Sequence, residues 1–295
     1  MKTVLVTGGA GFIGSHLCER LVKDGYKVIS LDNYFTGKKE NHVAGVEYRE
    51  GHTKDIAKLI PETPDIIFHL GEYSRTAVAL EEPGVVWDLN LTGTPAVLEF
   101  WREKNTQANA EKKIKLVYAG SSTKFADVRE DGVEGRHLSP YTHAKAVMSD
   151  LVRDYSRWYN LPYAISYFFN VYGPRELSGK YGTVIEIFKE QSLAGKPLTM
   201  RLPGTQKRNY THVEDTVDAL MLIAEKGEGD EFGIASAKSY TTREVAELFG
   251  GPIEELPARQ TSRPSTPVDT TNLQKLGWEE KHSLEEYVRG IKGKD

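Results

Sequence analysis

Four glycines fall within seven residues near the start of the chain, in the stretch VTGGAGFIGSH (Val6–His16). An apolar run precedes them and a helical pattern follows them. Glycine costs roughly 0.5–1 kcal/mol relative to alanine inside a helix or strand, so the cluster indicates a turn whose backbone is approached closely. The spacing Gly9-x-Gly11-x-x-Gly14 at a strand-to-helix turn is typical of a dinucleotide-binding loop.

Each glycine of this loop has an expected task. Gly9 would permit the tight turn, Gly11 would let a pyrophosphate approach the backbone, and Gly14 would let helix and strand pack closely. The helix start would offer free N–H groups and a positive dipole end to the phosphates. Asp32 follows at the end of the next strand, 18 residues after Gly14. Its carboxylate would bind a ribose 2′-hydroxyl and repel a 2′-phosphate, so we predict NAD as the cofactor rather than NADP. The predicted cofactor contacts from this part of the chain are Gly8, Gly11, Phe12, Ile13, Gly14, Asp32, Asn33, Leu70 and Gly71.

Apolar strands alternate with helical patterns over the first 170 residues. We expect strands at 2–7, 27–32, 65–70, 113–121 and 161–170, and helices at 12–24, 84–104 and 140–159. Near-continuous apolar strands that alternate with helices predict an α/β fold with a Rossmann-type, doubly wound parallel sheet.

The last third of the chain has a different texture. Glycine and proline punctuate 173–208, a helical pattern follows at 211–227, and shorter strand and helix patterns continue to the end. We predict that 1–169 form the NAD-binding domain, to which 209–235 return. Segments 170–208 and 236–295 would form a smaller, interleaved α/β lobe that binds the substrate.

Composition limits the possible partners. The formal net charge of −4 gives no electrostatic basis for binding nucleic acid or an anionic membrane. The longest apolar runs stay well short of the roughly 18 residues of a membrane span, and the apolar run in MKTVLVTGG is too short for a signal peptide. The single cysteine, Cys18, excludes an internal disulfide and fits a reducing compartment. We therefore expect a cytoplasmic protein.

The stretch SPYTHAKA places Tyr141 and Lys145 four residues apart, on one face of the helix that begins after Ser139. A tyrosine phenol is a poor base at neutral pH. An adjacent ammonium and the positive start of the helix both favour the phenolate, so the pair would act as an acid/base next to the cofactor. This spacing is also common by chance on solvated helices, and its meaning here comes from the dinucleotide loop upstream.

Hydroxyl side chains end the expected strand 113–121, in the stretch YAGSSTKFAD. Because carboxyl ends of parallel strands face the ligand crevice, Ser121, Ser122 and Thr123 could hold a substrate hydroxyl or carbonyl. The alternative is a helix-capping or turn segment.

The ordered set of motifs resembles the extended short-chain dehydrogenase/reductase superfamily, specifically its nucleotide-sugar epimerases and dehydratases. The motifs are TGGAGFIG, LDN, HLGE, NLTGT, SSTKFAD, YTHAK, FFNVYGPR, RNYTHVED and RPSTPVDTTNLQKLGW. The resemblance implies a tightly held, transiently reduced NAD and three catalytic residues. Tyr141 would take the proton of the sugar 4-hydroxyl, Lys145 would bind the nicotinamide ribose, and Ser121 would supply the catalytic hydroxyl.

The resemblance also implies the partners. Asn170, Arg208 and Arg263 would hold the diphosphate of a nucleotide sugar, a task that suits guanidinium groups because they bind phosphate bidentately. A homodimer would form through helices 84–104 and 140–159. No metal is expected.

Two departures from the family pattern bear on the reaction. The stretch HLGEY stands where HLAAQ is common, which introduces Glu72, and the acidic pair that 4,6-dehydratases carry after the catalytic hydroxyl is replaced by Ser122 and Thr123. Elimination of water needs a base and an acid at C5–C6, so we predict a 4-epimerase that forms a transient 4-keto sugar. The alternative is a 4,6-dehydratase, in which Glu72 would supply the missing carboxylate. A non-catalytic sensor would be expected to lose Tyr141 or Lys145. We count Glu72, Ser122 and Thr123 among the substrate contacts.

Overall fold

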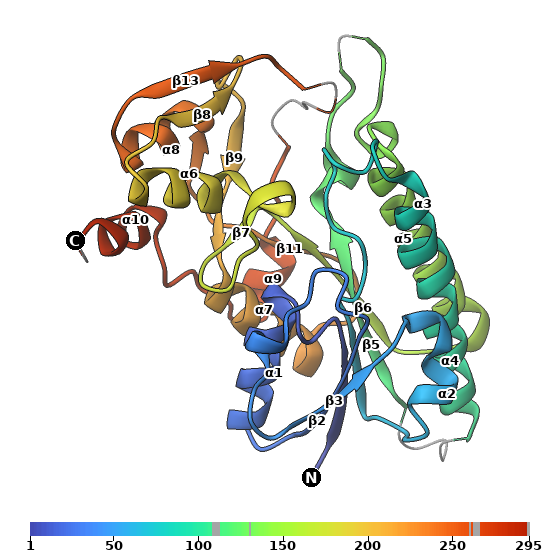
Figure 1. The fold of residues 1–295 in the computed structure, drawn as a ribbon. Helices are drawn as coiled ribbons and strands as arrows, with labels where there is room; N and C mark the ends of the chain where they lie inside the picture. The colour runs from blue at the N-terminus through green and yellow to red at the C-terminus, as the bar shows by residue number, and fades with distance from the viewer. Residues whose placement is uncertain (108–112, 130, 260, 262–265, 294–295) are drawn as a thin grey trace.

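The computed structural model describes residues 1–107, 113–129, 131–259, 261 and 266–293. At its centre is a seven-stranded parallel sheet with the order β11-β6-β5-β4-β1-β2-β3 (Figure 1). The strands are β1 (Thr3–Thr7), β2 (Lys27–Asp32), β3 (Val46–Glu50), β4 (Ile66–His69), β5 (Lys115–Ser121), β6 (Tyr163–Phe168) and β11 (Gly229–Ile234). The predicted Rossmann-type fold is confirmed, and β3, at the edge of the sheet, is a strand that the sequence patterns did not predict.

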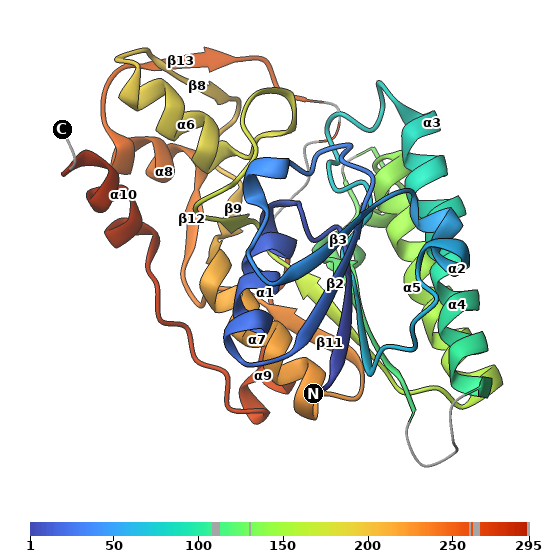
Figure 2. The same ribbon diagram turned by 60° about the horizontal axis from the view of Figure 1, so that its bottom comes forward.

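Helices cover both faces of this sheet, which explains why its inner strands are mostly apolar. Helices α1 (Phe12–Lys23) and α7 (Val213–Lys226) pack together on one face. On the other face lie α2 (Ile56–Leu59), α4 (Gly93–Gln107) and α5 (Pro140–Tyr159), as Figures 1 and 2 show. Within the described residues, no helix combines the length and apolar character needed to span a membrane.

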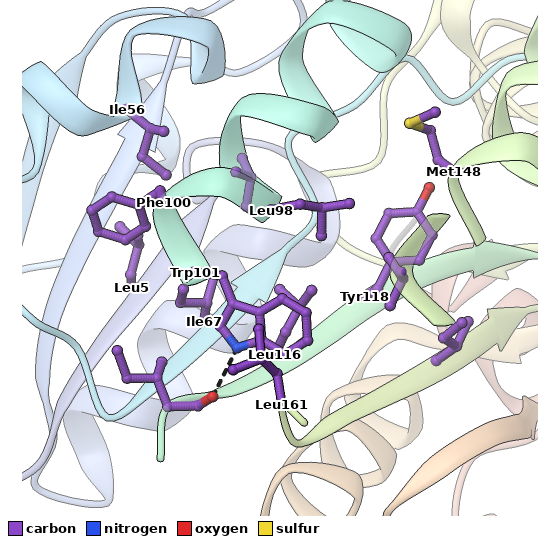
Figure 3. Packing of buried hydrophobic residues seen from close by; sticks show 14 of the residues in the cluster. Leu5, Ile56, Ile67, Leu98, Phe100, Trp101, Leu116, Tyr118, Met148 and Leu161 are labelled. Atoms are coloured by element: carbon purple, nitrogen blue, oxygen red, sulfur yellow. Dashed lines mark hydrogen bonds between the residues drawn. The ribbon is translucent and has the colours of Figure 1, made fainter. Parts of the chain in front are cut away.

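The core under α4 and α5 is built from large apolar side chains of the sheet and the helices (Figure 3). Trp101 of α4 is fully buried there and packs in the same cluster as Leu116 of β5. Its indole Nε1 donates a hydrogen bond to the carbonyl of Ile114 at 2.8 Å. This bond satisfies the polar atom of the indole inside the core and ties α4 to the start of β5.

The helix predicted at 84–104 is present but interrupted. It consists of α3 (Pro83–Val86), a π-helical turn η3 (Trp87–Thr92) and then α4. Asn90, in the π turn, uses its side-chain oxygen to accept from Tyr73 N–H (2.8 Å) and its amide to donate to the Tyr73 carbonyl (3.2 Å). The turn therefore fixes the loop that follows β4.

The smaller lobe has its own core. It contains α6 (Val184–Leu193), α8 (Thr242–Phe249), α10 (Leu284–Lys292) and the parallel pair β8 (Leu198–Arg201) and β13 (Ile253–Leu256). The return of the chain to the large sheet is seen in β11, which pairs with β6.

The segment around α9 (Thr271–Lys275) packs on a different lobe from the one predicted. The sequence patterns predict that 236–295 belong to the smaller lobe, yet Leu273 and Trp278 belong to the core cluster of α1 and α7. The Trp278 indole also donates to the carbonyl of Asp215 in α7 at 2.9 Å. This segment therefore packs on the large sheet.

Candidate functional site

A cleft of about 600 Å³ opens at the carboxyl edge of the large sheet and is lined by residues of both lobes. It lies at β1, where the strand order of the sheet reverses between β2 on one side and β4 on the other. Open α/β sheets bind their ligands at such a reversal. The predicted site residues that line it are Gly8, Gly11, Phe12, Ile13, Gly14, Asp32, Asn33, Leu70, Gly71, Glu72, Ser121, Ser122, Thr123, Tyr141, Lys145, Asn170 and Arg208. Arg263 lies outside the described residues.

The glycine loop between β1 and α1 is packed too closely for side chains. A Cβ on Gly14 would lie 2.1 Å from the carbonyl oxygen of Gly8, and one on Gly8 would lie 2.8 Å from Cα of Gly71. The positive φ of the turn, 76°, falls on Gly8. Gly9 lies in the same turn, and a Cβ there would lie 2.3 Å from Oγ of Ser30, so packing against β2 also requires this glycine.

The start of α1 is open toward the cleft. In the described part of the chain no side chain caps this helix, whose N-cap is Gly11, and residues Gly11 to Gly14 line the cleft. Uncapped N–H groups at a helix start, next to backbone that a Cβ would block, are the donors that a pyrophosphate requires. The loop therefore fits the phosphates of a dinucleotide.

Asp32 is held rigidly at the end of β2. Its carboxylate accepts hydrogen bonds from the backbone N–H groups of Ala10 (2.9 Å) and Tyr34 (2.8 Å), and the residue is 6% exposed. Burial raises the pKa of this carboxyl, and the two hydrogen bonds oppose that rise. Because Asp32 lines the cleft beside the glycine loop, it is in place to bind a ribose hydroxyl.

A capping box begins the helix that carries the Tyr–Lys pair. Ser139 Oγ accepts from Thr142 N–H (3.3 Å), and Thr142 Oγ1 accepts from Ser139 N–H (3.0 Å). This cap places Tyr141 in the first turn of α5, with Lys145 one turn later on the same face. Both residues are buried and line the cleft.

Ser121 ends β5 and lines the cleft with this pair. Its Oγ lies 2.9 Å from Thr123 Oγ1 and accepts from Thr123 N–H at 3.3 Å. The capping role considered for this segment is therefore real, and it leaves the hydroxyl in the cleft.

Glu72 lines the cleft but directs its carboxylate at the Tyr–Lys helix. It forms an ion pair with Lys145 Nζ, which also donates to the carbonyl of Ala119 at 2.6 Å. The same carboxylate accepts from Thr94 Oγ1 (2.8 Å) and from the Tyr118 hydroxyl (3.1 Å). The Glu72 side chain is 1% exposed, so it is a buried partner of Lys145.

A chain of hydrogen bonds leads from Thr7 through His69 and Thr94 to the carboxylate of Glu72. Thr7 Oγ1 accepts from Gly71 N–H at 3.0 Å and lies 2.7 Å from His69 Nδ1. His69 Nε2 lies 3.0 Å from Thr94 Oγ1, which donates to Glu72. Burial lowers the pKa of His69 to about 4, so the ring is neutral at neutral pH. The consistent assignment is a proton on Nε2.

The opposite wall of the cleft comes from the smaller lobe. Asn170, whose φ is 42°, donates from Nδ2 to the carbonyl of Asn209 at 3.0 Å. Arg208 donates to the carbonyl of Lys207 at 2.7 Å, and burial lowers the pKa of its guanidinium. Further polar side chains, which the sequence analysis missed, line the same cleft: Arg75, Lys180, Arg201, Gln206 and Arg259. They come from separate loops and strands, and only the fold reveals that they meet.

A cluster of possible metal ligands lies away from the cleft lining. His212, Glu214 and His282 place one ligand atom each within 4.8 Å of one another. His212 Nδ1 accepts from Glu214 N–H at 3.3 Å, and His282 Nδ1 lies 2.9 Å from an Asp215 oxygen. These bonds cap α7 and attach the C-terminal segment to it, so the cluster has a structural role.

Comparisons with known proteins agree with this geometry. The sequence pattern of the NAD dependent epimerase/dehydratase family matches residues 4–235. The chain belongs to this family. It is therefore an enzyme whose cofactor is NAD, as the glycine loop and Asp32 predicted.

Individual members of the family differ in their reactions. UDP-glucuronic acid decarboxylase 5 of Arabidopsis thaliana is 31% identical over 96% of this chain and 86% of its own length. A structure of UDP-glucose 4-epimerase from Thermotoga maritima with UDP-glucose is 30% identical, has a TM-score of 0.87, and the match covers 97% of this chain and 96% of that one. A UDP-glucose 4-epimerase of Thermus thermophilus, solved with NAD, is 29% identical with a TM-score of 0.85, covering 97% of this chain and 96% of that one. These similarities support a place in the epimerase/dehydratase superfamily and do not distinguish epimerase from decarboxylase.

Proposed function

We propose that the enzyme is a nucleotide-sugar 4-epimerase. The proposal rests on which side chains line the cleft. Ser121, Tyr141 and Lys145 line it together with the dinucleotide loop, and the acidic side chains that line it, among the described residues, are Asp32 and Glu72. Asp32 is bound by backbone N–H groups, and Glu72 is bound to Lys145. The cleft therefore holds the groups needed for oxidation at C4, and neither of the two carboxylates that line it among the described residues is free to serve elimination.

Tyr141, Ser121 and Lys145 have separate roles in the reaction at C4 of the sugar. NAD, when bound, supplies the acceptor for the C4 hydride and returns it. Tyr141 takes the proton from O4 and gives it back, Ser121 donates a hydrogen bond to the oxygen at C4, and Lys145 stabilises the phenolate and binds the nicotinamide ribose. The epimer would form when C4 of the keto sugar is reduced on its opposite face.

The substrate would be held by its diphosphate while the sugar turns. Asn170 and Arg208 line the wall that faces the reacting residues, and a guanidinium binds phosphate oxygens bidentately. Gripping the nucleotide diphosphate and leaving the sugar free to rotate is what an epimerase requires, because both faces of C4 must be presented in turn.

The 4,6-dehydratase alternative receives less support from this geometry. Dehydration needs a base for the C5 proton and an acid for the leaving 6-hydroxyl. Ser122 and Thr123 carry no carboxylate. Glu72, the remaining candidate, accepts hydrogen bonds from three side chains and is 1% exposed.

Oxidative decarboxylation of a nucleotide uronic acid is a second candidate, favoured by Arg75. This half-buried arginine lines the cleft, donates to the Tyr181 carbonyl, and forms no ion pair with an acid of the described chain. Its guanidinium could bind a C6 carboxylate. Loss of CO2 from a 4-keto uronate needs no base at C5, because the electrons of the breaking C5–C6 bond move toward the ketone. The decarboxylase relative fits this reading.

Product analysis tests the proposal. The enzyme is incubated with a panel of UDP-, GDP-, dTDP- and CDP-linked sugars that includes a UDP-uronic acid, and products are resolved by mass and NMR. An isobaric C4 epimer is expected. A product lighter by one water would establish a dehydratase, and one lighter by one CO2 would establish a decarboxylase.

We also propose a homodimer through the helical segments 84–104 and 140–159, as the family resemblance implies. Trp158 and Tyr159, at the end of α5, are 59% and 45% exposed. Light scattering of the purified enzyme should give twice the 33.0 kDa chain mass, and a monomer at micromolar concentration would contradict it.

A further inference from the structure

The positive charge of Lys145 is balanced by its ion pair with Glu72. Its Nζ has three N–H donors, of which one goes to Glu72 and one to the carbonyl of Ala119. The third remains for Tyr141 or for a ligand in the cleft. Glu72 therefore determines both where the ammonium sits and how much positive charge the site presents.

The position of Glu72 is built by the fold. Asn90 binds both the N–H and the carbonyl of Tyr73, the next residue, while Thr7 binds the N–H of Gly71, the preceding one. Thr94 and Tyr118 donate to the carboxylate itself. Hydrogen bonds thus hold the backbone on either side of Glu72 and reach both of its carboxylate oxygens. The side chain cannot turn toward the sugar without breaking them.

Among the described residues, Glu72 is the carboxylate that pairs with Lys145, and the other ionisable groups around it are neutral or positive. His69 is neutral at neutral pH because burial lowers its pKa to about 4. Burial and the carboxylate both raise the pKa of Tyr118 well above its usual value, so that phenol is neutral as well. Arg75 is a further cation that lines the cleft.

The charge matters for the redox state of the cofactor. The nicotinamide ring is positive in NAD+ and uncharged in NADH. If Glu72 were neutral, Lys145 would present an uncompensated positive charge where the nicotinamide ribose binds, which would disfavour the oxidised ring. With Glu72 charged, the pair is neutral and this penalty is removed.

We infer that Glu72 is a positioning residue that holds the Lys145 ammonium and biases the bound cofactor toward its oxidised form. The inference rests on the proposed function only in placing Lys145 beside the nicotinamide ribose. The bias suits a redox-neutral reaction, because it favours return of the hydride to the keto sugar and keeps the resting enzyme loaded with NAD+.

Cofactor affinity measured without any sugar tests this role. Dissociation constants for NAD+ and for NADH are determined at one pH for the wild type and for Glu72→Gln, which keeps the size of the side chain and removes its charge. We expect the ratio Kd(NAD+)/Kd(NADH) to rise about tenfold in the variant, the scale of a full charge acting through a partly screened site.

Two further variants separate charge from structure. Thr94→Val removes one hydrogen bond to Glu72 and leaves the charge in place, so the ratio should change by less than about twofold. Glu72→Asp keeps the charge and should also keep the ratio. If Glu72→Gln weakens both cofactors equally, loses both, or leaves the ratio unchanged, the inference is overturned. Because no sugar is present, failure of the epimerase proposal would appear separately, in the product analysis.

Discussion

The two walls of the cleft are built in different ways. The main part of the cofactor wall is the turn between β1 and α1 together with Asp32, within the first 32 residues, and the backbone of this turn is so closely packed that a Cβ on Gly14 has no room. The substrate wall consists of long side chains, such as Arg208 and Arg259, from segments far apart in the sequence. From this difference we expect local backbone geometry to recognise the cofactor and long side chains to recognise the proposed nucleotide sugar.

The largest effect is expected where the two walls meet, at Tyr141. Tyr141→Phe keeps the ring and its packing and removes the proton carrier, so turnover should fall by about 10²-fold or more. NAD affinity and the melting temperature should stay close to wild type. Steady-state kinetics with the accepted nucleotide sugar measures this, and a folded variant with near-normal turnover would remove Tyr141 from the mechanism.

The next effect tests the backbone character of the cofactor wall. Gly14→Ala places a Cβ 2.1 Å from the Gly8 carbonyl, so the turn must shift and NAD affinity should fall by about tenfold or more, a loss on the scale of an overpacked site. Gly290→Ala in α10 is the matched control, because a Cβ there meets nothing within 4 Å. Calorimetric titration with NAD should show normal binding for the control only.

Asp32 tests the side-chain part of the same wall. Asp32→Ala removes the carboxylate that would repel a 2′-phosphate, so the preference for NAD over NADP should shrink by about tenfold, as expected for the loss of a charged hydrogen bond. Affinities for the two dinucleotides, measured side by side, give the ratio. An unchanged ratio would mean that another group selects the cofactor.

A substitution in the substrate wall should weaken binding of the nucleotide sugar and leave NAD binding unchanged. Arg208→Ala should raise KM for the nucleotide sugar by about tenfold, because a charged hydrogen bond to phosphate is lost, while NAD affinity stays the same. Weakened NAD binding in this variant would show that the two walls are not independent.

The last prediction concerns stability rather than binding, and it involves one buried acid. Glu176 is 7% exposed, and burial raises its pKa to about 7. The folded state then holds a proton that the unfolded chain releases near its ordinary pKa, so the contribution to stability is lost as pH rises from about 4.5 toward 7 and above. Glu176→Gln should therefore be nearly neutral at pH 4 and stabilising by about 2 kcal/mol at pH 8. Urea denaturation at both pH values measures the difference, and a pH-independent effect would contradict it.

The sequence was most informative where structure is local. The alternation of apolar strands and helices predicted the sheet, and the glycine spacing with Asp32 predicted the cofactor, because both signals lie within short segments. Strand β3 was missed because its sequence, VEYRE, is polar and half-exposed at the sheet edge. The packing of Trp278 on α7 was missed because nothing in the local sequence shows which lobe a C-terminal helix will join.

The same distinction applies to the site. Tyr141 and Lys145 could be paired from their helical spacing. The partnership of Glu72 with Lys145 could not, because 73 residues separate them and the contact depends on β4, β5 and α5 lying side by side. The stretch HLGEY, with an acid where the family commonly has alanine, was the available signal, and it marked the residue without revealing its partner.

Transfer of a C4 label tests the central claim most directly. A nucleotide sugar deuterated at C4 is converted by the enzyme in ordinary water, and the product is examined by NMR and mass. The account predicts that the deuterium is retained at C4 of the opposite epimer, because the hydride leaves and returns to the same carbon. Deuterium found at C6, lost to solvent, or present in a product lighter by one CO2 would contradict it.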